Sequence, residues 1–256
     1  MKKIASYLFV LIVTLTGCLD TVEELTITAD GSGTYNSTMD MSGMFEMIEM
    51  MAAMDTSASK QMKQLSDKDI DSTISMKSFT DTASDLTEEQ KRLLSSAQMS
   101  ITMKQKDKLF KMGMNYPFKN LQDVQKIIEL NNSGKGVGAF GKGKDTETLP
   151  GMGDRGNMPS IGNFFDMVIK DGLIERKIND SKLQALNSDE KFKEMKNAGE
   201  MMGAVTFKSI IHLPRAATKI EGEKAKLSDD KKTVTISSAL TDLFENPSSL
   251  NFRIEY

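Results

Sequence analysis

The sequence has very few of the side chains on which most catalytic and metal sites depend. Its 256 residues include one cysteine, Cys18, one histidine, His212, and no tryptophan. One histidine and one cysteine cannot supply a tetrahedral zinc site, and a single cysteine cannot form an internal disulfide. No nucleophile elbow accompanies the histidine, so nothing indicates a serine-hydrolase triad. We therefore predict a protein that is not an enzyme, has no cofactor or metal, and is held together by its apolar core.

Clusters of positive charge and of aromatic residues are also lacking. The chain has 33 Lys and Arg against 36 Asp and Glu, and aromatic residues make up 6% of it. Nucleic-acid binding needs clustered Lys and Arg that neutralise phosphates. The balance of charge therefore argues against a nucleic-acid partner.

No apolar run is long enough to cross a membrane, and the most apolar one lies at the start of the chain. Lys2 and Lys3 precede an apolar stretch over residues 4–13, and Asp20 follows soon after. A membrane span needs about 20 apolar residues, whereas a basic start and a shorter apolar stretch are typical of a signal peptide. We interpret residues 1–17 as a signal peptide and residues 18–24 as a short acidic tether.

The residues before the cysteine, Leu15-Thr16-Gly17-Cys18, resemble the lipobox of bacterial lipoproteins. The resemblance implies that Cys18 becomes the N-terminus and carries a diacylglycerol and an amide-linked acyl chain such as palmitate. Several acyl chains hold a protein firmly, since each buried methylene contributes about 0.8 kcal/mol. Leu19, where inner-membrane lipoproteins often have Asp, favours the outer membrane. We expect the cell envelope as the location and the membrane as a partner through Cys18.

Alternation of apolar and polar residues predicts strands joined by tight turns. The predicted strand pairs are 25–28 with 34–39, 99–103 with 109–116, and 167–169 with 173–178. Further strands are predicted over 205–213, 233–236 and 250–256, and helices over 44–54, 121–128 and 189–202. This order predicts the α+β class: an antiparallel sheet of β-hairpins with helices packed on one face.

A Gly-rich stretch over residues 133–163 divides the chain. It contains Pro150 and Pro159 and has little apolar content, which is typical of a long loop or linker. Gly136 to Gly141 matches GxGxxG, but the predicted helix before it is the wrong context for a phosphate-binding loop. Two arrangements stay open: separate α+β parts at 19–132 and 164–256, or one continuous domain with a long insertion.

Methionine is frequent, with 20 residues. Met44, Met47, Met51 and Met54 share one face of the predicted helix with Ile48. Thioethers suit Cu(I), but such a stripe is more often core or an adaptable binding surface. We predict that these five residues line a groove for a ligand or partner, with Cu(I) binding as the alternative.

The remaining polar candidates indicate structural roles. If Ile211 and Leu213 face the core, His212 between them faces solvent as a surface strand residue. The acidic pairs Glu88-Glu89 and Asp229-Asp230 lie in helix-start and turn contexts. A hydrolase with an unrecognised carboxylate site is the last-ranked alternative.

Three passages carry a family resemblance: residues 25–34, 211–214 and 229–235. They resemble the LppM-type domain of bacterial lipoproteins, and uncharacterised Bacteroidota envelope lipoproteins. Pro214 is followed by Arg215 where that pattern often has Gly. The resemblance implies an α+β domain that binds lipid-like ligands, and it brings no catalytic residues. The expected function is that of a non-enzymatic, lipid-anchored envelope protein that binds a protein partner or an amphiphilic ligand.

Overall fold

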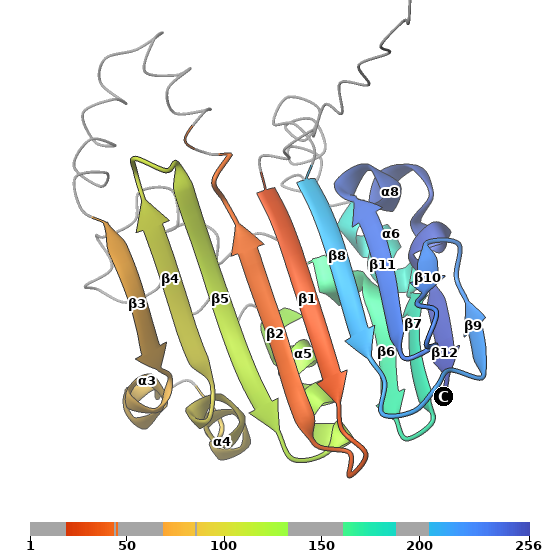
Figure 1. Cartoon of the computed structure of the whole chain (residues 1–256), viewed down its shortest axis with the longest axis horizontal. Coiled ribbons are helices and arrows are strands. Elements are labelled where there is room, and N and C mark those ends of the chain that lie inside the picture. Colours follow the sequence, from red (N-terminus) through yellow and green to blue (C-terminus); the bar gives the residue numbers. More distant parts are fainter. Residues whose placement is uncertain (1–18, 44, 46–68, 85, 133–160, 188–204) are drawn as a thin grey trace, which may run out of the picture.

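The main body of the protein is an eight-stranded sheet (Figure 1). The computed structural model describes residues 19–43, 45, 69–84, 86–132, 161–187 and 205–256. In spatial order the strands are β10 (Ala225–Leu227), β11 (Thr233–Ala239), β8 (Val205–His212), β1 (Leu19–Ile27), β2 (Gly33–Asp40), β5 (Leu109–Phe118), β4 (Gln98–Lys104) and β3 (Ile70–Ser75).

One strand pair in this sheet departs from the predicted antiparallel order. β1 runs parallel to β8, with Leu25 opposite Ile211, whereas every other pair in the described residues is antiparallel. The prediction of an antiparallel sheet of hairpins is wrong at this pair. A hairpin fixes direction only between consecutive strands, and β1 and β8 are far apart in the sequence.

The parallel pair joins the two ends of the chain in one sheet. β1 belongs to the part at 19–132 and β8 to the part at 164–256. One hydrophobic cluster also contains Leu25 and Ile127 from the first part and Ile174 and Ile254 from the second. In the described residues the two parts therefore share a sheet and a core, which corresponds to the continuous-domain alternative.

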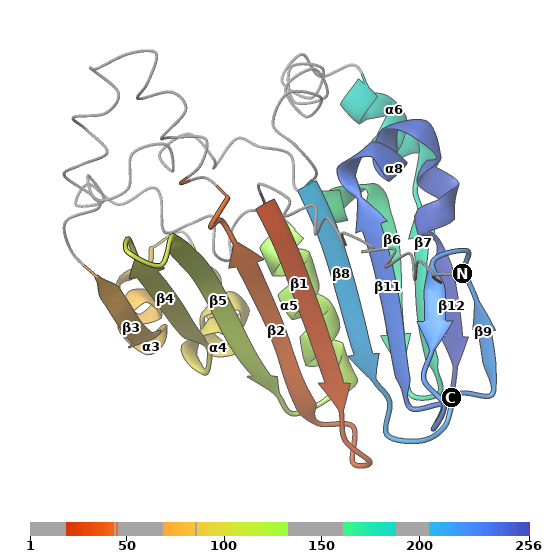
Figure 2. The ribbon, with the colours of Figure 1, turned by 45° about the horizontal axis from the view of Figure 1, so that its top comes forward.

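A second, four-stranded sheet lies behind one half of the large one (Figure 2). Its strands, all antiparallel, are β6 (Phe165–Lys170), β7 (Leu173–Ile178), β12 (Phe252–Glu255) and β9 (Lys219–Glu221). Ile174 is paired with Ile254, and both side chains are 0% exposed. This pair places the inner face of the small sheet in the shared core.

The described helices are short except for one. They are α3 (Lys77–Thr82), α4 (Glu88–Ser95), α5 (Leu121–Asn132), α6 (Asp180–Asn187) and α8 (Leu240–Glu245), with 3-10 turns η3 (Ile161–Phe164) and η4 (Pro247–Leu250). Buried residues of α4 and α5, including Leu94 and Val124, join the cluster formed with the large sheet. Thr87 caps α4: its hydroxyl accepts from the Gln90 backbone N–H, and the Gln90 side chain accepts from that of Thr87.

The two faces of the large sheet differ in polarity because side chains alternate along each strand. Leu25, Ile27 and Tyr35 point inward and are almost fully buried. On the outer face Asn115 donates a hydrogen bond to Asn36, at 2.5 Å. The outer face is thus polar, and the core lies between the large sheet and the elements behind it.

Residues 19–24 are not the acidic tether that the sequence suggested. They form the first part of β1, which pairs with β2 on one side and β8 on the other. Thr206 on β8 donates its hydroxyl proton to Asp20. Asp20 and Glu24 have partners on the outer face of this central strand, whereas Glu23 lies on its inner face.

The sheet has two distinct ends. We call one the Leu19 end: β1 and β8 begin there, β2 ends there, and the β4–β5 turn lies there (Figure 1). We call the other the Gly31 end, after the turn between β1 and β2.

Candidate functional site

The two predicted functional positions lie outside the described residues. They are Cys18, the predicted lipid carrier, and the predicted groove of Met44, Met47, Ile48, Met51 and Met54. The described structure nevertheless fixes where each segment joins the fold. Cys18 is bonded to Leu19, the first residue of β1, and β2 ends at Asp40, which is opposite Asp20. Both segments are therefore joined to the sheet at its Leu19 end.

Methionines elsewhere in the chain fill the core. Six of them are at most 8% exposed: Met41, Met76, Met99, Met103, Met112 and Met114. Their unbranched side chains adapt to irregular gaps between strands. Within the described structure, methionine therefore serves packing.

His212 lies on the outer face of the large sheet, as predicted. Ile211 and Leu213 are 3% and 5% exposed, whereas the His212 side chain is 37% exposed. Its Nε2 lies 2.8 Å from Oε1 of Glu24, and its Nδ1 lies 3.2 Å from the Thr233 hydroxyl. Both ring nitrogens thus have partners on neighbouring strands, and the arrangement is that of a surface polar contact.

A charged side chain that the sequence analysis did not identify lies between the two sheets. Arg176 on β7 is paired with Phe252, which is on the inner face of the small sheet. Its guanidinium carbon lies 4.8 Å from the ring centroids of both Phe165 and Phe252. Its Nε and Nη2 donate to the Leu250 carbonyl at 3.1 and 3.0 Å. The cation is thus held between two aromatic rings by a neutral acceptor.

Burial lowers the pKa of Arg176 to about 10, because a charged group loses hydration between the sheets. Glu23, on the inner face of β1, acts in the opposite direction through its negative charge. Among the described residues no carboxylate forms an ion pair with Arg176. The guanidinium has five N–H donors, and only those on Nε and Nη2 have an acceptor within this part of the chain.

The inner face of the large sheet carries further polar groups near Glu23. The Tyr116 hydroxyl donates to Oδ1 of Asn131 at 2.7 Å, and the Tyr35 and Tyr116 rings stack at 6.1 Å. Burial is the main cause that raises the pKa of both tyrosines, and Glu23 adds to it at Tyr35. Both hydroxyls therefore stay protonated and act as neutral hydrogen-bonding groups.

The sequence contained a usable signal for this cluster. Alternation places Arg176 on the same strand face as Ile174 and Ile178, and Glu23 on the same face as Leu25 and Ile27. A charged residue on an apolar face must find a partner or keep contact with water. A tether over residues 18–24 places Glu23 outside any strand, so the sequence prediction does not put this charge on an apolar face.

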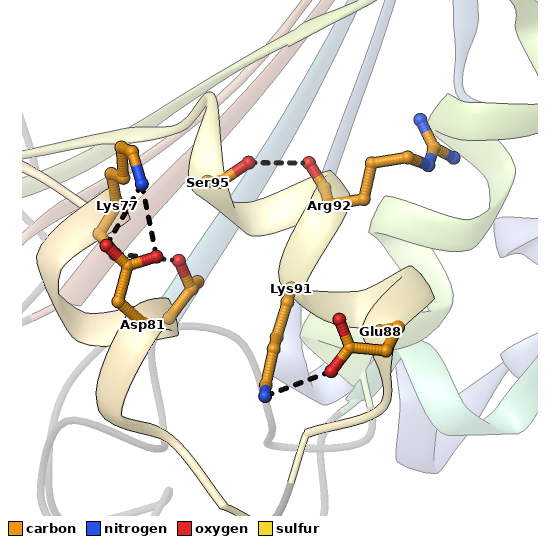
Figure 3. A pocket seen from close by; sticks show the side chains of 7 residues that line it. Lys77, Asp81, Glu88, Lys91, Arg92 and Ser95 are labelled. Atoms are coloured by element: carbon orange, nitrogen blue, oxygen red, sulfur yellow. Dashed lines mark hydrogen bonds and ion pairs between the residues drawn. The ribbon is translucent and has the colours of Figure 1, made fainter.

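A shallow polar cleft of about 390 Å³ lies between α3 and α4 (Figure 3). Its lining residues are Lys77, Thr80, Asp81, Glu88, Lys91, Arg92 and Ser95. The cations are already paired: Lys77 with Asp81, Lys91 with Glu88, and Arg92 with Asp123 of α5. Figure 3 shows Arg92 pointing away from Lys77 and Asp81. We therefore give this cleft no binding role.

The described residues contain neither a cluster of metal ligands nor a helix that could span a membrane. Within these ranges no three His, Cys, Asp or Glu side chains come together as metal ligands. No helix in the same ranges combines the length and apolar character needed to span a bilayer.

Comparison with known proteins gives one structural match. No protein-family model matches the sequence, and no curated protein matches it. Among solved structures, the folded domain of LppM from Mycobacterium tuberculosis, determined by NMR, is similar with a TM-score of 0.41 and 8% identity. The match covers 94% of this chain and 91% of that one. A likeness of this size identifies neither a family nor a function.

Proposed function

We propose that this protein is a non-enzymatic lipoprotein of the cell envelope, anchored through acyl chains on Cys18. The observation that carries the proposal is the position of Cys18. It ends a signal-peptide pattern and a lipobox-like motif, and it immediately precedes β1, the strand that joins both halves of the large sheet. Acylation at this point would hold the whole folded body at a membrane.

The N-terminal peptide of the purified mature protein tests this proposal. We expect mass spectrometry to find Cys18 as the first residue, carrying a diacylglycerol and an amide-linked acyl chain. A Cys18→Ser variant should lose palmitate labelling and leave the membrane fraction. A mature N-terminus at another residue, or a free thiol on Cys18, would contradict the proposal.

We further propose that the folded domain binds an amphiphilic ligand with an anionic head group. Arg176 supports it, because a guanidinium pairs strongly with carboxylate or phosphate. Phe165 beside it is half-buried and offers apolar surface to a hydrocarbon chain, whereas Phe252 on the other side of the guanidinium is part of the core. The Leu250 carbonyl orients the guanidinium, and Glu23 acts on its charge without forming an ion pair with it among the described residues.

Native mass spectrometry of protein extracted from membranes tests the binding step. We expect an anionic lipid to copurify with the wild type and to be lost from Arg176→Met. Arg253→Met is the matched control, because Arg253 is the residue after Phe252 on β12 and lies on the other face, paired with Glu175 and Glu255. A clean ligand-free mass, a protein partner in place of a lipid, or equal loss from both variants would contradict this assignment. Circular dichroism spectra of both variants establish that the fold is retained.

A further inference from the structure

Glu23 is a carboxylate in a row of polar side chains on the inner face of the large sheet. It lies on the same face of β1 as Leu25 and Ile27, which are each 4% exposed. Its register partners are Ser37 on β2 and Ser209 on β8, and all three residues of this polar row are half-buried. A charge on an inner face needs a partner or contact with water. Their partial exposure shows that the polar row is not sealed within the core.

The polar row lies between two apolar clusters. On the side towards the Gly31 end, Leu25 and Ile211 belong to the main cluster. On the side towards the Leu19 end, Phe207 packs against a second cluster. That cluster consists of Phe164, Leu240, Leu243 and Leu250. The inner face therefore changes from apolar to polar and back to apolar along β8.

Arg176 lies at the boundary of the same two clusters on the facing sheet. Its guanidinium carbon is 4.8 Å from the rings of Phe252, in the main cluster, and Phe165, which packs against the second. Glu23 acts on Arg176 through its charge, but these two described side chains form no ion pair with each other. A cation and a carboxylate therefore approach one polar zone from opposite sheets.

Both charged groups can form further hydrogen bonds. Burial raises the pKa of Tyr35 well above its ordinary value, and the charge of Glu23 and a hydrogen bond to it raise this pKa further. The tyrosine hydroxyl therefore donates to the Glu23 carboxylate. An ionised carboxylate has about four acceptor sites, so Glu23 can accept more hydrogen bonds than this one. Arg176 likewise has N–H donors beyond those that Leu250 accepts.

An anion bound at Arg176 would also lie in the field of Glu23, and like charges repel. A hydroxyl or ammonium group on the ligand can offset this repulsion, because hydrogen bonds to ionised groups are about twice as strong as neutral ones. We propose that Glu23 is a specificity-determining residue that selects head groups with a hydrogen-bond donor beside the anion held by Arg176. This inference rests on the proposed binding of an amphiphile with an anionic head group. A ligand without the donor leaves the carboxylate facing the anion with nothing between them.

Three phospholipids with the same acyl chains and one phosphodiester each provide the test. Phosphatidylglycerol offers hydroxyls, phosphatidylethanolamine offers an ammonium group, and phosphatidylpropanol has a propyl head group with neither donor. Each is added to the full-length protein in detergent after removal of copurified lipid, and native mass spectrometry measures the bound fraction. Glu23→Gln removes the charge and keeps an acceptor for Tyr35. Glu24→Gln is the matched control, because Glu24 lies on the outer face against His212.

We expect the wild type to bind phosphatidylglycerol or phosphatidylethanolamine about tenfold more tightly than phosphatidylpropanol, and the preferred lipid identifies the donor. This preference should fall severalfold in Glu23→Gln, because phosphatidylpropanol binds more tightly once the like charge is removed, and it should persist in Glu24→Gln. Equal binding of all three lipids by the wild type, or an unchanged preference in Glu23→Gln, would overturn the inference and leave the proposed function standing. Binding of none of them would overturn the proposed function, and this inference with it. Circular dichroism spectra of both variants establish that the fold is retained.

Discussion

The two ends of the large sheet are built differently. At the Gly31 end, Asp30 accepts hydrogen bonds from the hydroxyls of Thr28 and Ser32, at 2.5 and 2.7 Å. In the turn between β10 and β11, Asp230 accepts from the Ser228 hydroxyl at 2.5 Å. At the Leu19 end, the described contact in the turn between β4 and β5 joins two backbone groups, the Lys108 N–H and the Gln105 carbonyl, at 3.0 Å. The turns at the Gly31 end are thus closed by carboxylate side chains, whereas this contact in the β4–β5 turn is made by the backbone.

The helices strengthen this contrast. Arg92 of α4 pairs with Asp123 near the start of α5, and Lys126 pairs with Glu89. These contacts lie beside the end of β5 that enters α5 at the Gly31 end (Figure 1). We therefore expect substitutions at the Gly31 end to have the larger effects on stability.

Gly33 should give the largest effect. A Cβ at this position would lie 1.8 Å from the Thr26 carbonyl oxygen and 2.7 Å from the Phe118 ring. Backbone must move to remove the first clash, so we expect Gly33→Ala to lower the free energy of unfolding by at least about 3 kcal/mol. Urea denaturation followed by circular dichroism measures the change.

Gly31→Ala is the control for this prediction. Gly31 has a φ of 81°, which strains an L residue, but a Cβ there meets nothing within 4 Å. We expect a loss of only about 1 kcal/mol. Similar losses for the two variants would show that the close approach to Thr26 is not what requires glycine at position 33.

The contact between Arg92 and Asp123 should give the next largest effect, and it depends on pH. The Arg92 guanidinium lowers the pKa of Asp123 below its usual value of 3.8. A lowered folded-state pKa means that the stabilisation is complete above the unfolded-state value, near pH 4, and is lost as pH falls through the lower folded-state value. Asp123→Asn should cost about 1 kcal/mol at neutral pH.

Unfolding curves at neutral and acidic pH measure this effect. The difference between wild type and Asp123→Asn should narrow as pH falls below about 4, the ordinary range of the carboxyl group. Asp81→Asn is a control on α3. Both side chains of the Asp81–Lys77 pair are exposed, so this pair should contribute little to the free energy of unfolding. A difference between wild type and Asp123→Asn that does not change with pH would mean that the ionised carboxylate is not responsible.

The contact between Glu24 and His212 should be weaker, because both side chains are partly exposed. A double-mutant cycle with Glu24→Gln and His212→Gln should give a coupling energy of about 0.5 kcal/mol. Thr233 lies on the other side of the ring, so Thr233→Val tests whether it orients the histidine. A coupling energy of several kcal/mol would show that the pair is part of a larger network than the described contacts suggest.

The sequence predicted local elements better than their assembly. Alternation correctly located β4 with β5 and β6 with β7, and helical spacing located α5, because each pattern reflects contacts near in the chain. The β1–β8 pair depends on residues from opposite ends of the sequence, and no local pattern encodes its direction. The prediction for residues 19–24 was wrong for a related reason. The charges of Asp20 and Glu24 are tolerated in a strand because Thr206 and His212, which are distant in sequence, provide partners.

The candidate site was predictable only in part. The pattern before Cys18 identifies this residue from the sequence alone, because signal processing recognises that pattern. Only the structure shows that the next residue, Leu19, begins a strand of the large sheet. Arg176 is ordinary in the sequence and becomes notable only when Phe165, Phe252 and Leu250 surround it. The turn between β4 and β5 is ordinary hairpin sequence until the register shows that it lies at the end where β1 begins with Leu19.

Positive φ angles at two lysines provide the smallest and most closely matched comparison of the two ends. Lys231, in the turn between β10 and β11, has a φ of 58°, and Lys108, in the turn between β4 and β5, has a φ of 49°. Glycine relieves this strain but gains freedom in the unfolded chain, so we expect Lys231→Gly to stabilise the fold by about 0.5 kcal/mol. The backbone bond from Lys231 N–H to Ser228 O is kept in the variant. Urea denaturation followed by circular dichroism measures the change. A loss of stability in Lys231→Gly would show that the Lys231 side chain contributes more to the fold than the strain at its backbone costs.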